Sequence, residues 1–359
     1  MSPQPTINAF PDRVIARFMH KVYLANSDTA FDVSEGETIL AAAQRQGLNL
    51  PFGCQSGTCG ACRAQVTQGR VETLGEPPAL SPAERDAGFT LSCLAKPMGD
   101  VHLDLHLPGE FAALRPQLWP ARVIGKCWLA HDVIGLSLRL PQSERPLRWL
   151  AGQYLGVLTD DGGRRSFSIA NASGSELIEL HLRVVPGGRF ANWVAHDMPL
   201  RTILRFEAPL GAFFIRGDTR RPMVFMAGGT GLAPVRAMLQ ECVQRGETRP
   251  MTLFWGARAQ RDLYCDAELR ELSEHCPSLR YVPVLSEPDA DWQGARGWVH
   301  EAVLRHVPDI AGHELYMSGP PPMIEAGKRA FTEAGLDPAR MYYDSFEYAY
   351  RTFPVANAP

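Results

Sequence analysis

Long apolar runs are missing from this chain of 359 residues. No stretch approaches the roughly 18 consecutive apolar residues that a membrane-spanning helix needs. The first residues, MSPQPTINAFPDR, also lack a basic segment followed by an apolar one, which argues against a secretory signal. We therefore expect a cytoplasmic protein. Disulfides are rare in that compartment, so clustered members of the eight cysteines are better explained as metal ligands.

A strong charge of one sign is missing too. The formal net charge is −3 and the isoelectric point is near 6.4, which argues against nucleic acid as a partner. Acidic residues are concentrated early: residues 1–110 hold 12 acidic and 8 basic side chains, and the remainder holds 27 and 28. An acidic first part would steer a basic partner, although an ordinary solvated surface explains the same counts.

The chain is too long for one ordinary domain, and its pattern changes along its length. We expect residues 1–18 to be a leader, and residues 19–108 to form short strands with one helix around a cysteine-rich loop. We expect residues 109–119 to be a linker. Residues 120–218 hold short strands with regularly spaced turns, which is typical of an antiparallel β-barrel. Residues 219–359 alternate strands with helices, which predicts a parallel α/β sheet.

Local signals predict where the first helix lies. Ser34 and Glu37 have the spacing of a capping box, which predicts a helix beginning after Ser34. Apolar residues then recur at helical spacing, and Gly47 is placed to end the helix.

Cysteines gather in the loop that follows this helix. Cys54, Cys59 and Cys62 form a C-x4-C-x2-C pattern, and Cys93 lies 31 positions further on. This is the spacing of plant-type [2Fe–2S] ligands. A structural zinc site usually shows two separated C-x2-C pairs, so zinc and free thiols are the weaker alternatives. The other cysteines stand alone and are expected to be ordinary buried thiols: Cys127, Cys242, Cys265 and Cys276.

With this loop in place, residues 20–107 resemble a plant-type ferredoxin of β-grasp fold, and the chain beyond resembles the ferredoxin–NADP reductase superfamily. A ferredoxin followed by a flavin barrel and a nicotinamide domain is the order found in reductase components of bacterial multicomponent oxygenases. The reductase of 3,6-dideoxysugar synthesis is similar. The resemblance covers about residues 20–350 and implies a [2Fe–2S] cluster, FAD and NADH as cofactors. The sequence itself does not separate FAD from FMN, or exclude NADPH.

The segment Arg165–Ser166–Phe167–Ser168 resembles the superfamily's R-x-[YF]-[ST] flavin motif. The resemblance implies that Arg165 holds the pyrophosphate, that Phe167 packs beside the isoalloxazine or ribityl chain, and that the Ser168 hydroxyl bonds near N5. Arginine suits this task because its guanidinium donates paired hydrogen bonds to phosphate. An ordinary exposed strand is the alternative.

Gly187 and Gly188 resemble a GG-x-x-[ST] turn that opens a short helix facing the FAD diphosphate. Helix N-termini bind phosphate through their free N–H groups. Ala191 stands where a hydroxyl residue is usual, so one side-chain bond to phosphate is missing from the pattern. A glycine hairpin turn is the alternative. Gly152–Gln153–Tyr154 also resembles a GQY strand of the superfamily.

The nicotinamide site is expected in two loops that each join a strand to a helix. The first resembles GGTG-x-[AST]-P, in which glycines let the backbone approach a pyrophosphate and proline fits the first helical turn. The second resembles CGPP-x-M, with Ser318 where relatives have a cysteine near the nicotinamide C4. Generic strand-to-helix turns are the alternative. The residues assigned to cofactor binding are Gly228, Gly229, Thr230, Gly231, Pro234, Gly319, Pro320 and Met323.

Three further residues are assigned from the resemblance. Arg258 lies where relatives contact the adenosine end, and together with Arg261 it would favour NADPH if the pair gripped a 2′-phosphate. The relatives mostly use NADH, which we expect here. Phe346 resembles the aromatic residue that covers the flavin, and Asp344 replaces the usual glutamate near the ring. Both alternatively belong to core or surface.

The expected function is electron transfer. NADH would deliver a hydride to FAD, and a [2Fe–2S] cluster would pass single electrons to a partner oxygenase, a Rieske or a diiron hydroxylase. The residues assigned to the reacting centre are Ser168, Ser318, Asp344 and Phe346. Two alternatives remain: donation to a deoxysugar dehydratase, and a redox sensor that does not turn over. A monomer is expected.

Overall fold

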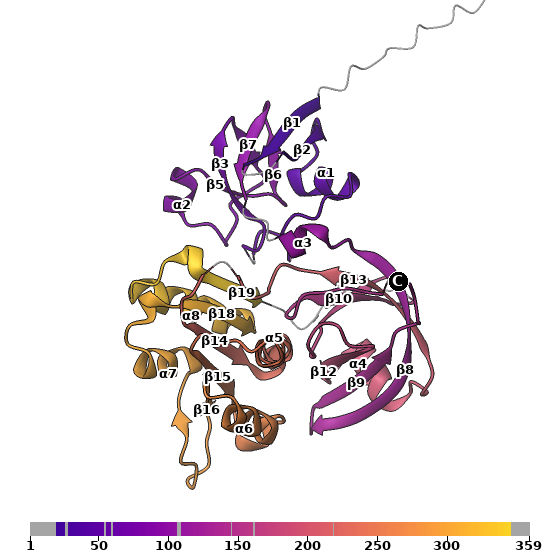
Figure 1. The fold of residues 1–359 in the computed structure, drawn as a ribbon, viewed down its shortest axis with the longest axis vertical. Helices are drawn as coiled ribbons and strands as arrows, with labels where there is room; N and C mark the ends of the chain where they lie inside the picture. The colour runs from indigo at the N-terminus through magenta and orange to yellow at the C-terminus, as the bar shows by residue number, and fades with distance from the viewer. Residues whose placement is uncertain are drawn as a thin grey trace, which may run out of the picture. The chain divides into compact units, whose positions relative to one another are not determined.

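The computed structural model describes residues 19–25, 28–53, 55–58, 60–105, 109–144, 146–160, 162–217 and 219–345. The chain divides into two compact units (Figure 1). The first holds residues 1–47 and 63–106, and the second holds residues 48–62 and 107–359. None of the helices in the described ranges is long and apolar enough to cross a membrane.

The first unit is a five-stranded mixed sheet in the order β2-β1-β7-β3-β5, with β1 and β7 parallel and the other described pairs antiparallel. Strands β4 and β6, which lie between β3 and β7 in sequence, form a separate two-stranded sheet. This is the expected α+β architecture. Its elements are β1 (Met19–Leu24), β2 (Ala30–Ser34), α1 (Ile39–Arg45), β3 (Arg63–Gln68), β4 (Val71–Thr73), α2 (Pro82–Asp86), β5 (Phe89–Leu91), β6 (Ala95–Pro97) and β7 (Val101–Asp104).

Helix α1 begins later than its capping signal predicts. The Ser34 amide does donate to the Glu37 carboxylate at 3.1 Å, but Ser34 is the last residue of β2. The helix starts at Ile39, and its N-cap is Thr38, whose hydroxyl accepts from the Ala41 amide at 3.3 Å. The prediction of Ser34 as the cap was therefore wrong, whereas Gly47 follows the last turn in a left-handed conformation (φ 72°), as expected.

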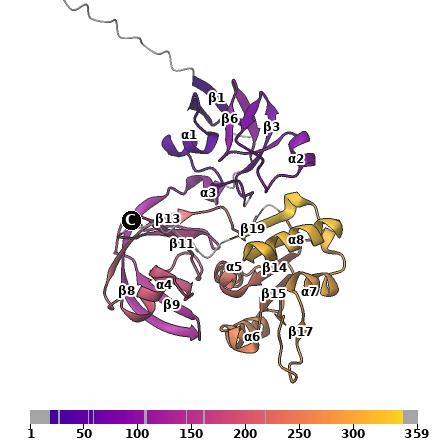
Figure 2. The same cartoon turned by 180° about the vertical axis from the view of Figure 1, so that it is seen from behind.

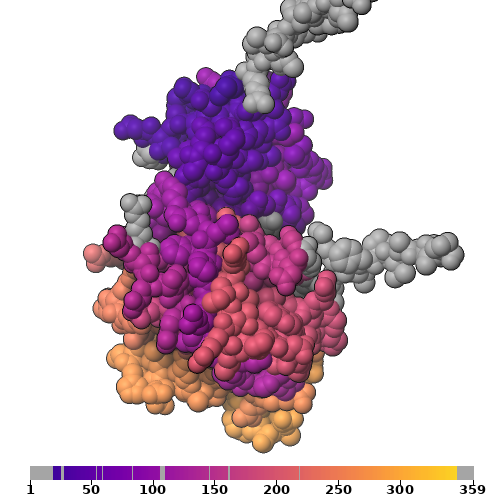
Figure 3. Space-filling view, turned by 90° about the vertical axis from the view of Figure 1, so that its right-hand side faces the viewer, coloured from indigo at the N-terminus to yellow at the C-terminus, as the bar shows by residue number. Residues whose placement is uncertain are grey.

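The strands between residues 117 and 210 form the antiparallel barrel of the second unit. Its six strands are all antiparallel, in the order β11-β10-β13-β8-β9-β12. A bridge between Ile169 and Leu180 joins the two edge strands. In the space-filling view the residues of the barrel, magenta to pink, form a continuous outer surface (Figure 3). The elements are α3 (Gly109–Ala113), β8 (Gln117–Ala130), β9 (Val133–Arg139), β10 (Tyr154–Leu158), β11 (Arg164–Ser168), β12 (Leu177–Arg183), α4 (Arg189–His196) and β13 (Ile203–Leu210).

The stretch 109–119, expected to be a linker, holds α3 and the start of β8. Phe111 of α3 is 1% exposed and packs with Ala212, Phe214 and Leu150. This segment is therefore ordered and anchored on the barrel.

The rest of the second unit is a six-stranded parallel sheet in the order β17-β16-β15-β14-β18-β19. Helices cover both of its faces (Figures 1 and 2). The elements are β14 (Met223–Gly228), η1 (Gly229–Gly231), α5 (Leu232–Gln244), β15 (Met251–Ala257), η2 (Gln260–Asp262), α6 (Asp266–His275), β16 (Leu279–Leu285), β17 (Ala295–Arg296), α7 (Val299–His306), η3 (Ile310–Gly312), β18 (Glu314–Gly319), α8 (Pro321–Glu333), η4 (Pro338–Arg340) and β19 (Met341–Ser345).

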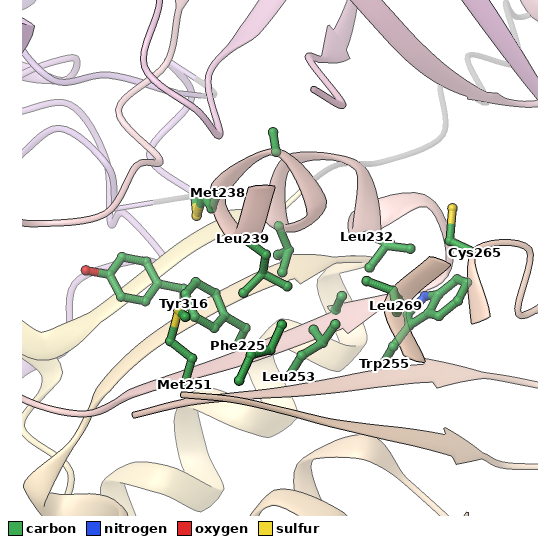
Figure 4. Packing of buried hydrophobic residues seen from close by; sticks show 14 of the residues in the cluster. Phe225, Leu232, Met238, Leu239, Met251, Leu253, Trp255, Cys265, Leu269 and Tyr316 are labelled. Atoms are coloured by element: carbon green, nitrogen blue, oxygen red, sulfur yellow. The ribbon is translucent and has the colours of Figure 1, made fainter. Parts of the chain in front are cut away.

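Strand β14 is buried over its whole length because the sheet has a core on each face. Phe225 and Ala227 pack with α5 and α6 on one face. Figure 4 shows Leu239 of α5 beside Phe225, and Leu232 of α5 beside Leu269 and Trp255. Val224 and Met226 pack with α7 and α8 on the other face. The strand order reverses between β14 and β18. In parallel sheets such a switch point opens a crevice at the carboxyl ends of the strands, where ligands bind.

Candidate active site

The two predicted nicotinamide loops meet at this switch point. Ala227, at the end of β14, is in register with Ser318 of β18. A Cβ on Gly228 would lie 2.5 Å from the Met323 sulfur, and a Cβ on Gly231 would lie 2.6 Å from the Ser318 carbonyl carbon. At Gly231 the obstacle is backbone, so only glycine fits there, whereas at Gly228 the obstacle is the flexible Met323 side chain. The backbone of the first loop is therefore held against the second loop at Gly231.

Trp255 of β15 fixes the first loop from beside it. The indole is fully buried, and its N–H donates to the Gly229 carbonyl oxygen at 3.0 Å. Gly229 itself has a left-handed backbone (φ 55°). This support from the neighbouring strand was not predicted, because it depends on the register of β14 with β15.

Three of the four residues assigned to the reacting centre come together beside these loops. Ser318 and Asp344 are in register on the parallel strands β18 and β19. Ser168, at the end of the barrel strand β11, donates its hydroxyl to the Asp344 carboxylate at 3.3 Å. A strand of the flavin barrel and two strands of the parallel sheet therefore converge. Phe346 lies outside the described residues.

Burial changes the acidity of this centre. Desolvation raises the pKa of Asp344 to about 6, and the hydrogen bond from Ser168 opposes part of this rise. Ser318 is fully buried, and its hydroxyl oxygen has no hydrogen-bond partner among the described residues. An unsatisfied buried hydroxyl costs about 1–3 kcal/mol. A polar ligand edge placed here would recover that cost, so the site fits a nicotinamide ring.

The predicted flavin strand, β11, is an edge strand of the barrel. Its Phe167 ring lies 5.4 Å from the Phe190 ring of α4, measured between centroids. Helix α4 follows Gly187 and Gly188, and its N-cap, Gly188, supplies no side-chain hydrogen bond. The first amides of α4 are therefore not capped by that residue. The predicted flavin strand and the predicted diphosphate turn are neighbours, as a flavin nucleotide requires.

Ala191 packs by its methyl group against the barrel core instead of offering a hydroxyl. The neighbouring Asn192 amide donates to the carbonyl oxygens of Val185 (2.9 Å) and Gly188, which closes the glycine turn. The Arg165 guanidinium donates to the Arg164 carbonyl oxygen at 3.1 Å. The turn is thus built without the side chain that the superfamily pattern expects.

The GQY segment has a structural part to play. Gln153 is 1% exposed; it accepts from the Leu150 amide at 2.8 Å and donates to the Gly211 carbonyl oxygen at 2.8 Å. Tyr154 donates to the Gly53 carbonyl oxygen at 3.4 Å. Gly53 is the residue before the first expected cluster ligand, so the barrel holds the start of the cysteine loop within the second unit.

The loop that carries the predicted cluster ligands is tightly wound. Cys54 and Cys59 lie outside the described residues. Three positions in the loop have left-handed backbones: Gln55 (φ 58°), Gly57 (φ 81°) and Gly60 (φ 67°). Such turns let successive amides point towards an anion, which suits a thiolate cluster.

The other two predicted ligands are buried cysteines. Cys62 is 1% exposed and Cys93 is 8% exposed. Cys62 directly precedes Arg63, which is paired with Leu91, and Cys93 follows Leu91 by two positions. The donor set in this part of the chain therefore fits thiolate ligation.

Arg258 and Arg261 are exposed at the carboxyl end of β15 and in η2. This is the same sheet edge as the two loops, because the strands are parallel. Their placement is compatible with contacts to the adenosine end of a nucleotide.

Sequence reasoning missed a stripe of polar residues on the barrel strand β12. Glu179, His181 and Arg183 alternate with buried apolar residues. Arg183 pairs with Asp132 at 2.6 Å, and a Cβ on Gly229 would lie 3.0 Å from its guanidinium. His181 bonds the Tyr264 hydroxyl at 3.1 Å. The alternation in LIELHLR was a visible signal, but it did not reveal which surface the stripe meets.

Comparison with known proteins followed the same division of the chain. Residues 22–98 match the family described as 2Fe-2S iron-sulfur cluster binding domain. Residues 120–215 match the oxidoreductase FAD-binding domain, and residues 225–329 match the oxidoreductase NAD-binding domain.

Whole-length relatives were also found. CDP-6-deoxy-L-threo-D-glycero-4-hexulose-3-dehydrase reductase of Yersinia pestis is 36% identical over 90% of this chain and 98% of its own. The reductase component of phenol 2-monooxygenase from Pseudomonas sp. is 34% identical over 91% and 94%. Among solved structures, the Amycolatopsis cytochrome P450 reductase GcoB is 32% identical, with a TM-score of 0.71, over 91% of this chain and 98% of its own.

Proposed function

The chain belongs to the iron–sulfur flavoprotein reductases that join a [2Fe–2S] domain to FAD- and NAD-binding domains, and we propose that it carries electrons from NADH to an oxygenase of the Rieske or diiron type. It is an NAD(P)H-dependent oxidoreductase with these three cofactors. The observation that carries the proposal is the convergence of Ser168, Asp344 and Ser318 between the flavin strand and the two nucleotide loops.

Bound FAD would supply hydride uptake from the nicotinamide and one-electron donation to the cluster, so the protein's task is placement. We assign Arg165 and the first amides of α4 to the FAD diphosphate. The backbone of Gly228–Gly231 holds the nucleotide pyrophosphate. We assign Ser318 and the Ser168–Asp344 pair to the reacting centre, where the pair holds a proton.

The assignments that accompany this proposal keep their sequence basis. The cluster ligands are Cys54, Cys59, Cys62 and Cys93, Phe346 covers the flavin, and Arg258 contacts the adenosine end. The domains run over residues 19–108, 120–218 and 219–359. The protein is a cytoplasmic monomer.

A dehydrase of deoxysugar synthesis is the second acceptor class, because one of the whole-length relatives is the reductase of such a dehydrase. The reductase component of a phenol monooxygenase favours an oxygenase. Offering the NADH-reduced protein to a hydroxylase component and to a dehydrase, and following reoxidation of the cluster absorbance, separates the two.

The first experiment is an anaerobic titration of the purified protein with NADH, followed by visible absorbance. Bleaching of both the flavin and the cluster bands at near-stoichiometric NADH is expected. Bleaching of the flavin alone would break the proposed route at the cluster. Bleaching only with NADPH would move the specificity to Arg258 and Arg261, and no bleaching with either nucleotide would favour a sensor that does not turn over.

A further inference from the structure

Helix α5 carries the nicotinamide loop at its start and lies on the face of the sheet turned to the barrel (Figures 1 and 2). Its sequence, LAPVRAMLQECVQ, has two charged residues, Arg236 and Glu241. The Arg236 side chain is only 13% exposed. A charged group taken so far out of water needs partners that replace its hydration.

Three different elements supply those partners. The guanidinium donates to the Ala170 carbonyl oxygen at 2.8 Å, two residues beyond Ser168 of the flavin strand. It also donates to the carboxylates of Glu179 on β12 (2.8 Å) and Glu268 on α6 (2.7 Å). One rigid fork therefore ties the end of the flavin strand, the barrel wall and the nicotinamide domain together.

The same face of α5 makes two more bonds to the barrel backbone. Gln240, one turn after Arg236, accepts from the Ala172 amide at 3.3 Å and donates to Glu268 at 3.1 Å. Glu241 accepts from the Ser173 amide at 3.1 Å. We call Arg236, Gln240 and Glu241 the α5 clasp. The clasp bonds the backbone of residues 170–173, which directly continues the flavin strand.

Resting on the proposed function, we propose that Arg236 is a positioning residue that sets the distance between the nicotinamide loop and the flavin strand. Arg236 lies two residues after Pro234 of the loop, and Ala170 lies two residues after Ser168 of the reacting centre. A displacement at the clasp is therefore passed directly to both. A misplacement of about 1 Å is enough to slow a reaction of this kind roughly a hundredfold.

The test compares the variants Arg236→Met, Arg236→Lys and Glu179→Gln with the control Arg270→Met. Arg270 is half-exposed and pairs within its own helix with Asp266. The rate of flavin bleaching is measured against NADH concentration in anaerobic rapid mixing. In Arg236→Met we expect the limiting rate to fall roughly ten- to a hundredfold, with little change in the half-saturating NADH concentration.

The conservative variants sharpen the outcome. Lysine keeps the charge but not the fork, so Arg236→Lys should recover only part of the rate. Glu179→Gln should slow the reaction less, because it breaks only the contact between Glu179 and Arg236. Combining it with Arg236→Met should add little, because Arg236→Met already breaks that same contact. The control should match wild type.

A second readout does not depend on turnover. The amides of Ala172 and Ser173 are bonded by the clasp, so their hydrogen exchange in the purified protein should speed up in Arg236→Met and not in Arg270→Met. If Arg236→Met does not fold, Arg236→Lys and Glu179→Gln carry both measurements.

The outcomes separate this inference from the proposed function. Wild-type protein that NADH does not bleach would overturn the proposed function. Wild-type bleaching together with unchanged limiting rates in the Arg236 and Glu179 variants would overturn the positioning role alone. A change confined to the half-saturating NADH concentration would also overturn it, because it would place Arg236 in nucleotide binding.

Discussion

The buried carboxyl of Asp344 makes the stability of the folded protein depend on pH. Its pKa is raised from 3.8 to about 6 by burial. The folded protein therefore holds this proton more tightly than the unfolded chain, and the associated stability is present below about pH 4 and lost as the pH rises to 6. Asp344→Asn stays neutral, so it should be more stable than wild type above pH 6, by at most about 3 kcal/mol.

Urea unfolding of both proteins between pH 4 and pH 8 checks this prediction. The two free energies of unfolding should converge near pH 4 and separate as the pH rises. Ser168→Ala is the matched control, because it removes the hydroxyl that bonds Asp344 and leaves the carboxyl in place. A constant difference at all pH values would show that Asp344 does not titrate in this range.

His181 gives the opposite sign. Burial, aided by the charge of Arg236, lowers the pKa of His181 from 6.5 to about 3. The unfolded chain then binds a proton that the folded protein excludes, so stability is lost as the pH falls below 6.5. At pH 5 the loss is about 2 kcal/mol. His181→Asn, whose amide can still bond the Tyr264 hydroxyl, should lose less stability than wild type between pH 7 and pH 5. Urea unfolding midpoints of both proteins at the two pH values measure these losses. Equal losses would show that the pKa of His181 is not lowered in the folded protein.

Which residue roles could be predicted follows from how far apart the partners lie in the chain. Ser168 and Ser318 stand inside short motifs, so neighbouring residues marked them. The bond from Ser168 to Asp344 spans 176 positions and was not predictable. Arg236 and Arg183 belong to no motif that we recognised, because their partners come from other elements and are set by packing.

The loop that follows β14 tests the fit between elements. A Cβ on Gly231 would overlap the carbonyl group of Ser318, which is backbone and cannot rotate away. Gly231→Ala should therefore force the two nucleotide loops apart and slow NADH-dependent flavin bleaching at least roughly a hundredfold. Gly217→Ala is the control, because a Cβ there meets nothing within 4 Å. Wild-type rates in Gly231→Ala would show that the loops need not touch.

Elements were predicted well where their pattern is regular and less well where two signals compete. The alternation of strand and helix after residue 219 identified the parallel sheet. The cap of α1 was misplaced because Ser34 is already used by β2, where it pairs with Met19. The helix then waits for Thr38. The proline-bearing stretch 109–119 contains α3 because Phe111 packs with Leu150, Ala212 and Phe214, tertiary contacts that local sequence does not reveal.

At the scale of the whole molecule, the order of cofactors along the chain follows from local patterns, while the grouping of segments does not. Residues 48–62 lie in sequence between α1 and β3 of the first unit, but they belong to the second unit. Asn49 shows why: its buried side-chain amide donates to the Phe111 carbonyl oxygen at 3.0 Å. The cysteine loop is therefore anchored by bonds to residues more than fifty positions away.

The division of labour between cofactors predicts that the cluster can be removed without stopping the flavin. Cys62 is a buried thiol at the end of the loop, so Cys62→Ser should remove the cluster absorbance and its iron, because a hydroxyl is a poor ligand for this centre. NADH should still bleach the flavin, and a two-electron dye should still be reduced. Reduction of cytochrome c, which takes one electron at a time, should fall at least roughly tenfold, since the two-to-one conversion depends on the cluster.

Cys127→Ser is the matched control for that change, because Cys127 lies on β8, outside the cysteine loop. Its thiol is exposed, so the prediction of a buried thiol at this position was wrong. It should keep its iron and all three activities. If Cys62→Ser lost iron but reduced cytochrome c at the wild-type rate, electrons would leave from the flavin directly, and the cluster would have no place in the route. If it kept both iron and spectrum, Cys62 would not be a ligand. Loss of flavin bleaching as well would mean that the cysteine loop supports the barrel. Tyr154→Phe tests that dependence, because it removes the hydrogen bond from Tyr154 to the Gly53 carbonyl oxygen.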